Sequence, residues 1–284
     1  MIKIGTNGIS NIMIGSTQAQ KAYLGTTLIW EYNSSSVVIE TMADKYFTCE
    51  ACASNCTLTF KIAKQVTAAD LSYIEYSLDD GSTWTRTNNV DATEISISIP
   101  SLSNGDTVLF RGSGKRLSCG TTYNGANYYS NITATQNFKV YGNIMSTLYL
   151  DNFADKVTFP ASVNAIFGAL FYNSTHLVDA ADLILPATTL VNTDTYNDMF
   201  RNTRITESPE LPALTLTESC YKRMFQDCTN LIKITMLATS ISAKNCMQDW
   251  VKNISTTGVL YKNSSATWTG YLPNNNWTTQ TITV

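Results

Sequence analysis

A short motif that recurs through the second half of the chain constrains the fold most. An aromatic residue, two variable residues, an apolar residue and Phe recur at residues 167–171, 196–200 and 221–225, and residues 247–251 form a degenerate fourth copy. The copies begin 29, 25 and 26 residues apart, which lies in the range of leucine-rich repeats. One copy cannot bury its apolar face alone, so the pattern predicts a stacked solenoid over residues 143–284.

Each copy is expected to combine a helical turn with a strand. Positions i, i+3 and i+4 share one face of a helix, so the aromatic motif predicts a helical turn. Leu- and Ile-rich segments follow at residues 185–190, 211–216 and 237–241. These segments predict the short strands of an α/β repeat, with a closing cap near the C-terminus.

Residues 37–142 have the alternating pattern of an all-β domain. Apolar residues occupy every second position at 58–62, 74–78 and 95–99, and Asp80-Gly81 is a strong hairpin turn. Five to eight strands in this length predict an immunoglobulin-like or fibronectin-like sandwich. The sequence from Ser77 through Asp79 and Gly81 to Trp84 fits the Asp-box pattern, in which these residues shape a hairpin; we expect a structural role for it.

Residues 1–32 predict short paired strands. Short segments rich in Ile and other apolar residues alternate with glycines at about ten-residue spacing, which is typical of hairpins. A strand module this small is not stable alone, so we expect it to pack on another domain, on copies of itself or on a larger partner. Residues 33–36 form a linker. The predicted fold is therefore mainly β and multidomain, with an N-terminal hairpin module, a sandwich and a repeat domain.

Composition excludes several function classes. With 19 basic and 22 acidic residues and no like-charge run, we expect no nucleic-acid binding. A single histidine, His176, excludes multi-His metal sites, and its place in a repeat turn predicts a structural role. No carboxylate pair stands out, so we expect neither an enzyme nor a cofactor. The start has no secretory signal pattern, and no apolar stretch is long enough to span a membrane.

The seven cysteines leave several interpretations open. Cys49, Cys52 and Cys56 with the distant Cys119 allow a four-cysteine zinc site, although the spacing is irregular. A disulfide within the cluster, or reduced thiols acting as small apolar residues, are the alternatives. Cys220 and Cys246 hold equivalent positions one repeat apart, where either a disulfide or a ladder of small buried side chains would fit.

Several aromatic residues in polar, Asn-rich surroundings are candidates for glycan contact. Tyr and Trp stack on sugar rings, but the same residues also cap β edges and solenoid ends. The candidates are Tyr128, Tyr129, Trp268, Tyr271 and Trp277.

The C-terminal half resembles the BspA-like leucine-rich repeat family. The resemblance is carried by CYKRMFQDCTNL at residues 220–231, by LPATTL at 185–190 and by a cap-like ending from WVKNISTTG at 250–258 through Trp268 to Trp277. The family is common in surface proteins of gut bacteria and in their phages. The resemblance implies a capped repeat solenoid and transfers no catalytic residue.

The N-terminal and middle regions resemble parts of phage structural proteins. KAYLGTTLIWE at residues 21–31 is similar to leaders of phage fibre proteins, and residues 47–51, 76–84 and 140–146 are similar to domains that precede such repeats in phages of gut Bacteroides-type bacteria. The resemblance implies virion attachment through the N-terminus. The residues it assigns to anchoring are Ile2, Ile4, Ile12, Ile14, Tyr23, Leu24 and Trp30.

These observations predict a non-enzymatic phage virion surface protein, either a head-fibre or a tail-fibre subunit or a capsid decoration protein. Its expected partners are virion structural proteins at the N-terminus and a host-surface glycan or protein at the repeats, and we expect a homo-oligomer. A bacterial cell-surface adhesin of BspA type is the alternative, and a glycan-cleaving enzyme is a third class.

Overall fold

The computed structural model describes residues 13–14, 17–18, 21–24, 27–31, 41–63, 71–87, 95–114, 117, 122–123, 126–127, 129–159, 163–274 and 276–283. These residues form several β-sheets and almost no helix, so the mainly β prediction is confirmed. The chain divides into two compact units, Met1–Thr41 and Met42–Val284.

The first unit contains two antiparallel strand pairs. Strands β1 (Met13–Ile14) and β2 (Thr17–Gln18) form one pair. Strands β3 (Lys21–Leu24) and β4 (Thr27–Glu31) form the other, in which Ala22 lies opposite Trp30. The short paired strands predicted from the glycine spacing are therefore present.

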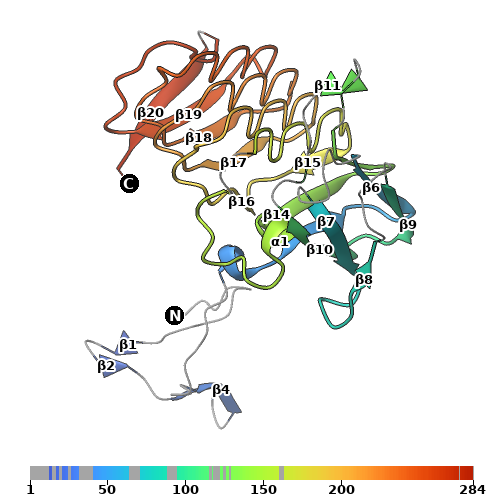
Figure 1. The fold of residues 1–284 in the computed structure, drawn as a ribbon. Helices are drawn as coiled ribbons and strands as arrows, with labels where there is room; N and C mark the ends of the chain where they lie inside the picture. The colour runs from blue at the N-terminus through green and yellow to red at the C-terminus, as the bar shows by residue number, and fades with distance from the viewer. Residues whose placement is uncertain are drawn as a thin grey trace. The chain divides into compact units, whose positions relative to one another are not determined.

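The second unit begins with two facing sheets (Figure 1). The larger has seven strands in the order β15-β14-β5-β10-β7-β8, with β16 also on β14, and the smaller has the order β13-β6-β9. Their strands are β5 (Phe47–Ala51), β6 (Cys56–Ile62), β7 (Leu71–Ser77), β8 (Thr85–Arg86), β9 (Ile95–Leu102), β10 (Thr107–Gly114), β13 (Asn131–Ala134), β14 (Phe138–Asn143), β15 (Leu177–Asp179) and β16 (Leu183–Ile184). A separate pair joins β11 (Thr122–Tyr123) to β12 (Ala126–Asn127).

The two sheets share an apolar core. Alternate residues of β6 are buried, as the period-2 pattern predicts. Phe60 of β6 packs edge-on against Phe110 of β10, with ring centroids 5.2 Å apart. Ser146 in the short helix α1 (Ser146–Tyr149) accepts the backbone N–H of Phe47 at 3.0 Å and donates to the carbonyl of Phe110 at 2.8 Å. This buried hydroxyl therefore joins α1 to β5 and β10. A short 3-10 turn, η1 (Met42–Asp44), precedes β5.

The Asp-box pattern shapes a hairpin, as predicted. Ser77 Oγ donates to Asp79 Oδ1 at 2.8 Å and accepts the N–H of Gly81 at 2.9 Å. Gly81 has φ +84°, which an L side chain rarely adopts. The Trp84 ring packs edge-on against Tyr46 at 5.0 Å, and the Arg111 guanidinium lies 4.1 Å from its centroid. The motif has a structural role here.

Strand β14 joins the sandwich to the repeats. It pairs antiparallel with β5 on one side and parallel with β15 and β16 on the other. The predicted boundary between residues 142 and 143 therefore lies inside one compact unit, although the repeat pattern begins there.

The repeats form a stack of coils in which the aromatic motifs lie on four turn segments, residues 163–173, 192–202, 217–227 and 243–253 (Figure 1). Backbone N–H groups bond alternately within the segment and to the next coil. Leu170 donates to Phe167 O, whereas Phe167 donates to Thr195 O at 2.9 Å and Tyr196 donates to Cys220 O at 3.0 Å. The helical turns predicted for these segments are therefore wrong, because none of the four turn segments contains a helix.

The reason for this difference is the backbone conformation. Every fourth residue of each turn segment has positive φ, which Asn and Asp tolerate better than most residues. Positions i and i+4 still share the inner face, so both structures bury the same side chains. The positive-φ positions are Ala165, Ala169 and Asn173, then Asp194, Asp198 and Asn202, then Ser219, Arg223 and Asp227, then Asn245, Asp249 and Asn253.

Aromatic ladders fill the centre of the stack. Phe200 lies between Phe171 at 5.2 Å and Phe225 at 5.7 Å, and Tyr196 stacks on Tyr221 at 6.0 Å. All five side chains are buried, so the predicted alignment of the motif copies is confirmed.

The strands of the repeats lie mostly elsewhere than predicted. A four-stranded parallel sheet joins β17 (Glu207–Leu211), β18 (Lys233–Met236), β19 (Gly258–Asn263) and β20 (Trp277–Ile282). Apart from Leu211 at the end of β17, the described residues of the expected strand segments contribute isolated bridges, from Thr189 to Thr215 and from Thr215 to Ser240. The strands were predicted on the Leu-Pro segments, whereas the longer strands lie after the turn segments and end at or before those sequences.

Candidate functional site

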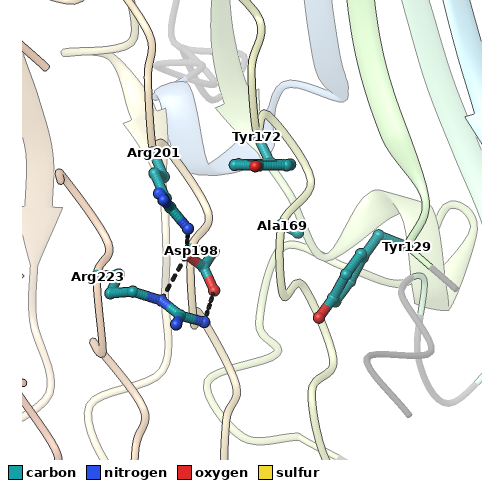
Figure 2. A pocket seen from close by; sticks show the side chains of 6 residues that line it. All are labelled: Tyr129, Ala169, Tyr172, Asp198, Arg201 and Arg223. Atoms are coloured by element: carbon teal, nitrogen blue, oxygen red, sulfur yellow. Dashed lines mark hydrogen bonds and ion pairs between the residues drawn. The ribbon is translucent and has the colours of Figure 1, made fainter. Parts of the chain in front are cut away.

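A pocket of about 240 Å³ lies where the sandwich meets the first coils, and Figure 2 shows its lining. Tyr129 comes from the segment just before β13, and the other side chains come from the first three turn segments. The lining residues are Tyr129, Ala169, Tyr172, Asp198, Arg201 and Arg223.

Asp198 organises the charged wall of this pocket. Its Oδ1 accepts Arg223 Nε at 2.9 Å and its Oδ2 accepts Arg223 Nη2 at 2.6 Å. Arg201 Nη1 lies 3.4 Å from Oδ1. Only 9% of the Asp198 side chain is exposed, so this two-point pair is largely shielded from water. The hydrogen bonds to Asp198 raise the pKa of Arg223, which stays charged.

The pocket exists because one repeat position carries a small side chain. Ala169, Asp198, Arg223 and Asp249 hold the same positive-φ position in successive coils, and each of the first three donates its backbone N–H to the next coil. The later coils place a long or charged side chain there. In the first coil a methyl group leaves the space beside Asp198 open.

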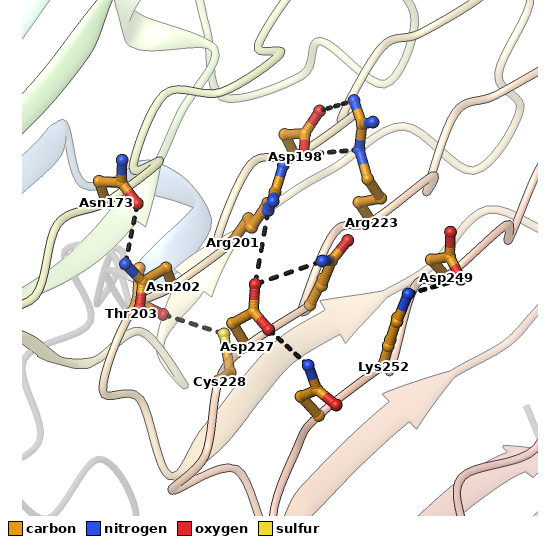
Figure 3. Close-up of polar contacts among 12 residues, drawn as sticks. Asn173, Asp198, Arg201, Asn202, Thr203, Arg223, Asp227, Cys228, Asp249 and Lys252 are labelled. Carbon is orange, nitrogen blue, oxygen red and sulfur yellow. Dashed lines mark hydrogen bonds and ion pairs between the residues drawn. The ribbon is translucent and has the colours of Figure 1, made fainter.

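Arg201 forms the adjoining part of the wall. Its guanidinium carbon lies 5.4 Å from the Tyr172 ring centroid, and Nε lies 3.7 Å from Asp227 Oδ2. That Nε is buried and makes no hydrogen bond to the described residues. Figure 3 shows Asp227 facing Arg201. The Asp227 oxygens also accept hydrogen bonds from Asn253 Nδ2 at 2.9 Å and from Gln226 Nε2 at 3.3 Å.

Tyr129 stands opposite this charged wall in Figure 2. Its side chain is half-buried. Burial and the nearby Asp198 carboxylate raise the pKa of Tyr129, whereas Arg223 lowers it less. The phenol is therefore neutral at pH 7 and can both donate and accept a hydrogen bond. The pocket combines two guanidinium groups with two phenol rings, which suits an oxygen-rich ligand with a ring face.

A second pocket of about 240 Å³ lies beside β14. Its charges are largely matched: Lys139 Nζ lies 3.1 Å from Glu50 Oε1, and Lys45, Asp179 and Asp182 also line it. Burial and Glu50 raise the pKa of Tyr141 to about 12. The lining residues of this pocket include three carboxylates (Glu50, Asp179 and Asp182) and two lysines, so it is less suited to an anionic group, and we place the candidate site in the first pocket.

The cysteine cluster does not form a metal site in the described residues. Cys49 and Cys56 are buried on strands of the two different sheets, and Cys52 Sγ lies 3.8 Å from Glu50 O. No group of three or more Cys, His, Asp or Glu side chains in the described part could share a metal ion. Cys119 lies outside the described residues.

Cys220 and Cys246 are buried free thiols and continue a column that begins at Thr195. The ladder of small buried side chains is confirmed for this position. His176 is half-buried, and its carbonyl accepts the N–H of Phe138, which agrees with a structural role in a repeat turn.

The five glycan-contact candidates are not brought together. Trp268 and Trp277 are buried, and their indole N–H groups donate to Ala238 O and Ser255 O, both at 2.8 Å. Each buried indole therefore has an acceptor for its N–H, and both rings belong to the core of the last repeats. Tyr271 is 49% exposed but lies apart from the pocket lining. Of the five, Tyr129 alone lines the candidate pocket, and Tyr128 lies outside the described residues.

The anchoring candidates belong to the first unit. Ile14, Tyr23, Leu24 and Trp30 lie on its short strands. Ile2, Ile4 and Ile12 lie outside the described residues.

The charged wall of the pocket was missed from the sequence. Asp198 and Arg223 occupy variable positions of two motif copies and Arg201 follows one of them, so the motif does not mark them as a site. The available signal was the repeat alignment, in which Ala169 aligns with Asp198, Arg223 and Asp249. A small residue at a position that is otherwise charged marks a gap in the stack.

Among the described residues, no helix is long and apolar enough to cross a membrane. Comparison with known protein families, with curated proteins and with solved structures finds no match to this chain.

Proposed function

We propose that this protein is a non-enzymatic surface protein of a phage virion, a head-fibre or tail-fibre subunit. In this proposal residues 1–32 attach it to the particle. An immunoglobulin-like sandwich then acts as a spacer, and a BspA-like leucine-rich repeat solenoid adheres to the host surface.

The observation that carries the proposal is the division of the chain into units of very different size. Met1–Thr41 forms a unit of its own, with two pairs of short strands. Isolated two-stranded pairs are at best marginally stable in water, so this unit needs a partner surface. A virion protein would supply that surface, in agreement with the resemblance of residues 21–31 to fibre leaders.

The larger unit supports the adhesive half of the proposal. Its first coils hold a polar pocket walled by Asp198, Arg201 and Arg223, with no acid–base pair of carboxylates among the lining residues. Such a pocket binds one group weakly. Many copies on one particle convert weak single-site binding into strong attachment.

The test is the location of the full-length protein on intact particles. We expect mass spectrometry to find the chain in purified virions, and gold-labelled antibody against it to mark their surface. A Trp30→Ala change in the phage genome should lower the copy number per particle, whereas Tyr271→Ala, at an exposed ring of the repeat cap, should not. Absence of the chain from purified particles would refute the proposal.

A bacterial cell-surface adhesin of BspA type is the second candidate, because the family that the repeats resemble occurs in bacterial surface proteins as well as in phages. The same antibody separates the two. Labelling of the bacterial envelope in cultures that produce no particles would favour the adhesin.

A further inference from the structure

The space beside Asp198 is shaped by the repeat itself. At this position the stack runs from Ala169 through Asp198 and Arg223 to Asp249, and Arg223 already occupies the far side of the Asp198 carboxylate. The near side is open because Ala169 has no side chain beyond its methyl group. One missing side chain therefore leaves a pocket of about 240 Å³, smaller than a typical drug-sized site and suited to one ring-sized unit.

Some guanidinium N–H groups in the pocket have no acceptor among the described residues. Arg223 uses Nε and Nη2 on Asp198, and no contact of the described residues uses its Nη1. Arg201 approaches Asp198 only through Nη1 at 3.4 Å, and its buried Nε has no hydrogen-bond partner in the described part of the chain. Guanidinium groups bind carboxylates through paired N–H···O bonds, so an acceptor with two oxygens fits this wall best.

The local charges allow such a ligand to enter. Both Asp198 oxygens face guanidinium nitrogens, so an incoming carboxylate meets N–H groups rather than a bare carboxylate. Asp227 accepts hydrogen bonds from Asn253 and Gln226 and lies 3.7 Å from Arg201 Nε, so both ion pairs of Arg201, this one and the 3.4 Å contact with Asp198, are long. A ligand carboxylate would give Arg201 shorter hydrogen bonds than these two long contacts.

The aromatic part of the lining suits a sugar ring. Tyr172 carries Arg201 above its ring, and Tyr129 stands across the pocket (Figure 2). Both phenols offer an apolar face together with a hydroxyl that can donate or accept. A pyranose presents the complementary pattern of C–H groups and hydroxyls.

We propose that the pocket over Ala169 binds a carboxylated sugar unit of a surface polysaccharide, with Arg201 and Arg223 on its carboxylate and Tyr129 and Tyr172 on its ring. The proposal rests on the adhesive function proposed above and specifies its ligand class. It makes the first coils, rather than the C-terminal cap, the binding end of the repeats.

The experiment compares glucuronic acid with glucose, which differ by the carboxylate. Ligand-observed NMR titration of the full-length protein is expected to give a Kd on the order of 1 mM for glucuronate, and binding at least ten-fold weaker for glucose. Equal binding of the two sugars, or no binding of glucuronate, would overturn the proposal.

Two matched variants test the place of binding. Ala169→Arg should fill the pocket while keeping the fold, because Arg223 holds the same repeat position at φ +53°. Asn245→Arg places the same side chain at another positive-φ position outside the pocket lining. We expect A169R to weaken glucuronate binding at least ten-fold and N245R to leave it unchanged, with circular dichroism confirming the fold of both.

A third variant covers the case in which A169R does not fold. Arg201→Gln keeps a polar side chain and removes the guanidinium that has only long ion pairs, and it should reduce the preference for glucuronate over glucose. Unaltered glucuronate binding by A169R or R201Q would refute the site. Glucuronate binding without virion localisation would refute only the proposed function, and the converse would refute only the pocket assignment.

Discussion

Arg223 closes a two-point ion pair on Asp198, the residue that holds the same position one coil earlier: Nε lies 2.9 Å from Oδ1 and Nη2 lies 2.6 Å from Oδ2. Opposite charges face each other elsewhere between the same two coils, as at Glu207 and Lys233, where Nζ lies 2.8 Å from Oε2. A shift of one coil against the next would break these pairs. These ion pairs therefore help to fix the register of one coil against the next, which stacked aromatic rings specify less strictly.

Asp198→Asn should destabilise the protein. The substitution keeps a residue that tolerates positive φ but leaves the partly buried Arg223 without its charge partner. We expect a loss of about 2 kcal/mol of unfolding free energy, below the value for a fully buried pair because one-third of Arg223 is exposed. Asp249→Asn at the same repeat position, with its side chain 42% exposed, should cost less than about 0.5 kcal/mol in urea unfolding. Equal losses would contradict the role of the pair.

Ala169→Asn should stabilise the fold. Ala169 has φ +57°, a conformation that costs most L-residues about 1 kcal/mol and that Asn tolerates better. The open pocket leaves room for the amide. Ala169→Val, which adds a β-branched side chain at the same φ, should lower stability instead. A thermal melt in which both variants move in the same direction would refute the strain argument.

Tyr196→Phe should not weaken the protein. The Tyr196 hydroxyl is fully buried and has no hydrogen-bond partner among the described residues, so its removal relieves an unmet polar group. Tyr46→Phe is the control, because it removes a 2.8 Å hydrogen bond to Asp151 and should cost about 1 kcal/mol. Chemical denaturation of both variants distinguishes them, and an equal loss would indicate a bound partner at Tyr196.

Gly258→Ala should be severely destabilising. A Cβ at this position of β19 would lie 2.4 Å from the backbone oxygen of Ile232 and 2.6 Å from the Trp277 ring. The strand must shift, so we expect a loss of about 3 kcal/mol or more, as in overpacked cores. Gly270→Ala meets nothing closer than 4.0 Å and should leave the unfolding midpoint nearly unchanged.

Stability should fall in alkaline solution. Burial raises the pKa of Cys220 to about 12 and that of Cys228 to about 11, against 9.0 for an unperturbed thiol. The unfolded chain loses these protons first, so their contribution is intact below pH 9 and declines as the pH rises toward the folded pKa. Relative to neutral pH, each thiol should lower the free energy of unfolding by about 1.4 kcal/mol at pH 10.

The check is urea unfolding under reducing conditions at pH 8 and pH 10. Replacing both Cys220 and Cys228 by Ala should make the fall between the two pH values smaller by about 2–3 kcal/mol. The comparison uses the pH difference, so the packing cost of the substitutions cancels. An identical fall in the variant would show that other groups control it.

Much of the fold was predictable because it depends on local patterns. The alternation at residues 58–62, the Asp-box turn at Ser77–Gly81 and the aromatic repeat all place their side chains as expected. The repeat turns were predicted to be helical because i, i+3 and i+4 spacing fits a helix. The same spacing also fits consecutive turns that bond to a neighbouring coil, and only the stacked partner decides between them.

The candidate site likewise depends partly on local sequence and partly on contacts between coils. The sequence by itself determined that the apolar positions of the strands and of the aromatic motif are buried, because apolar period and repeat length are properties of the chain. It also indicated Tyr129, through its polar surroundings, but it grouped Tyr129 with Trp268 and Trp277, which the core takes up. Tertiary structure alone placed Asp198, Arg201 and Arg223 on one wall and left Ala169 as the gap beside them, because contacts between coils depend on register across about 25 residues.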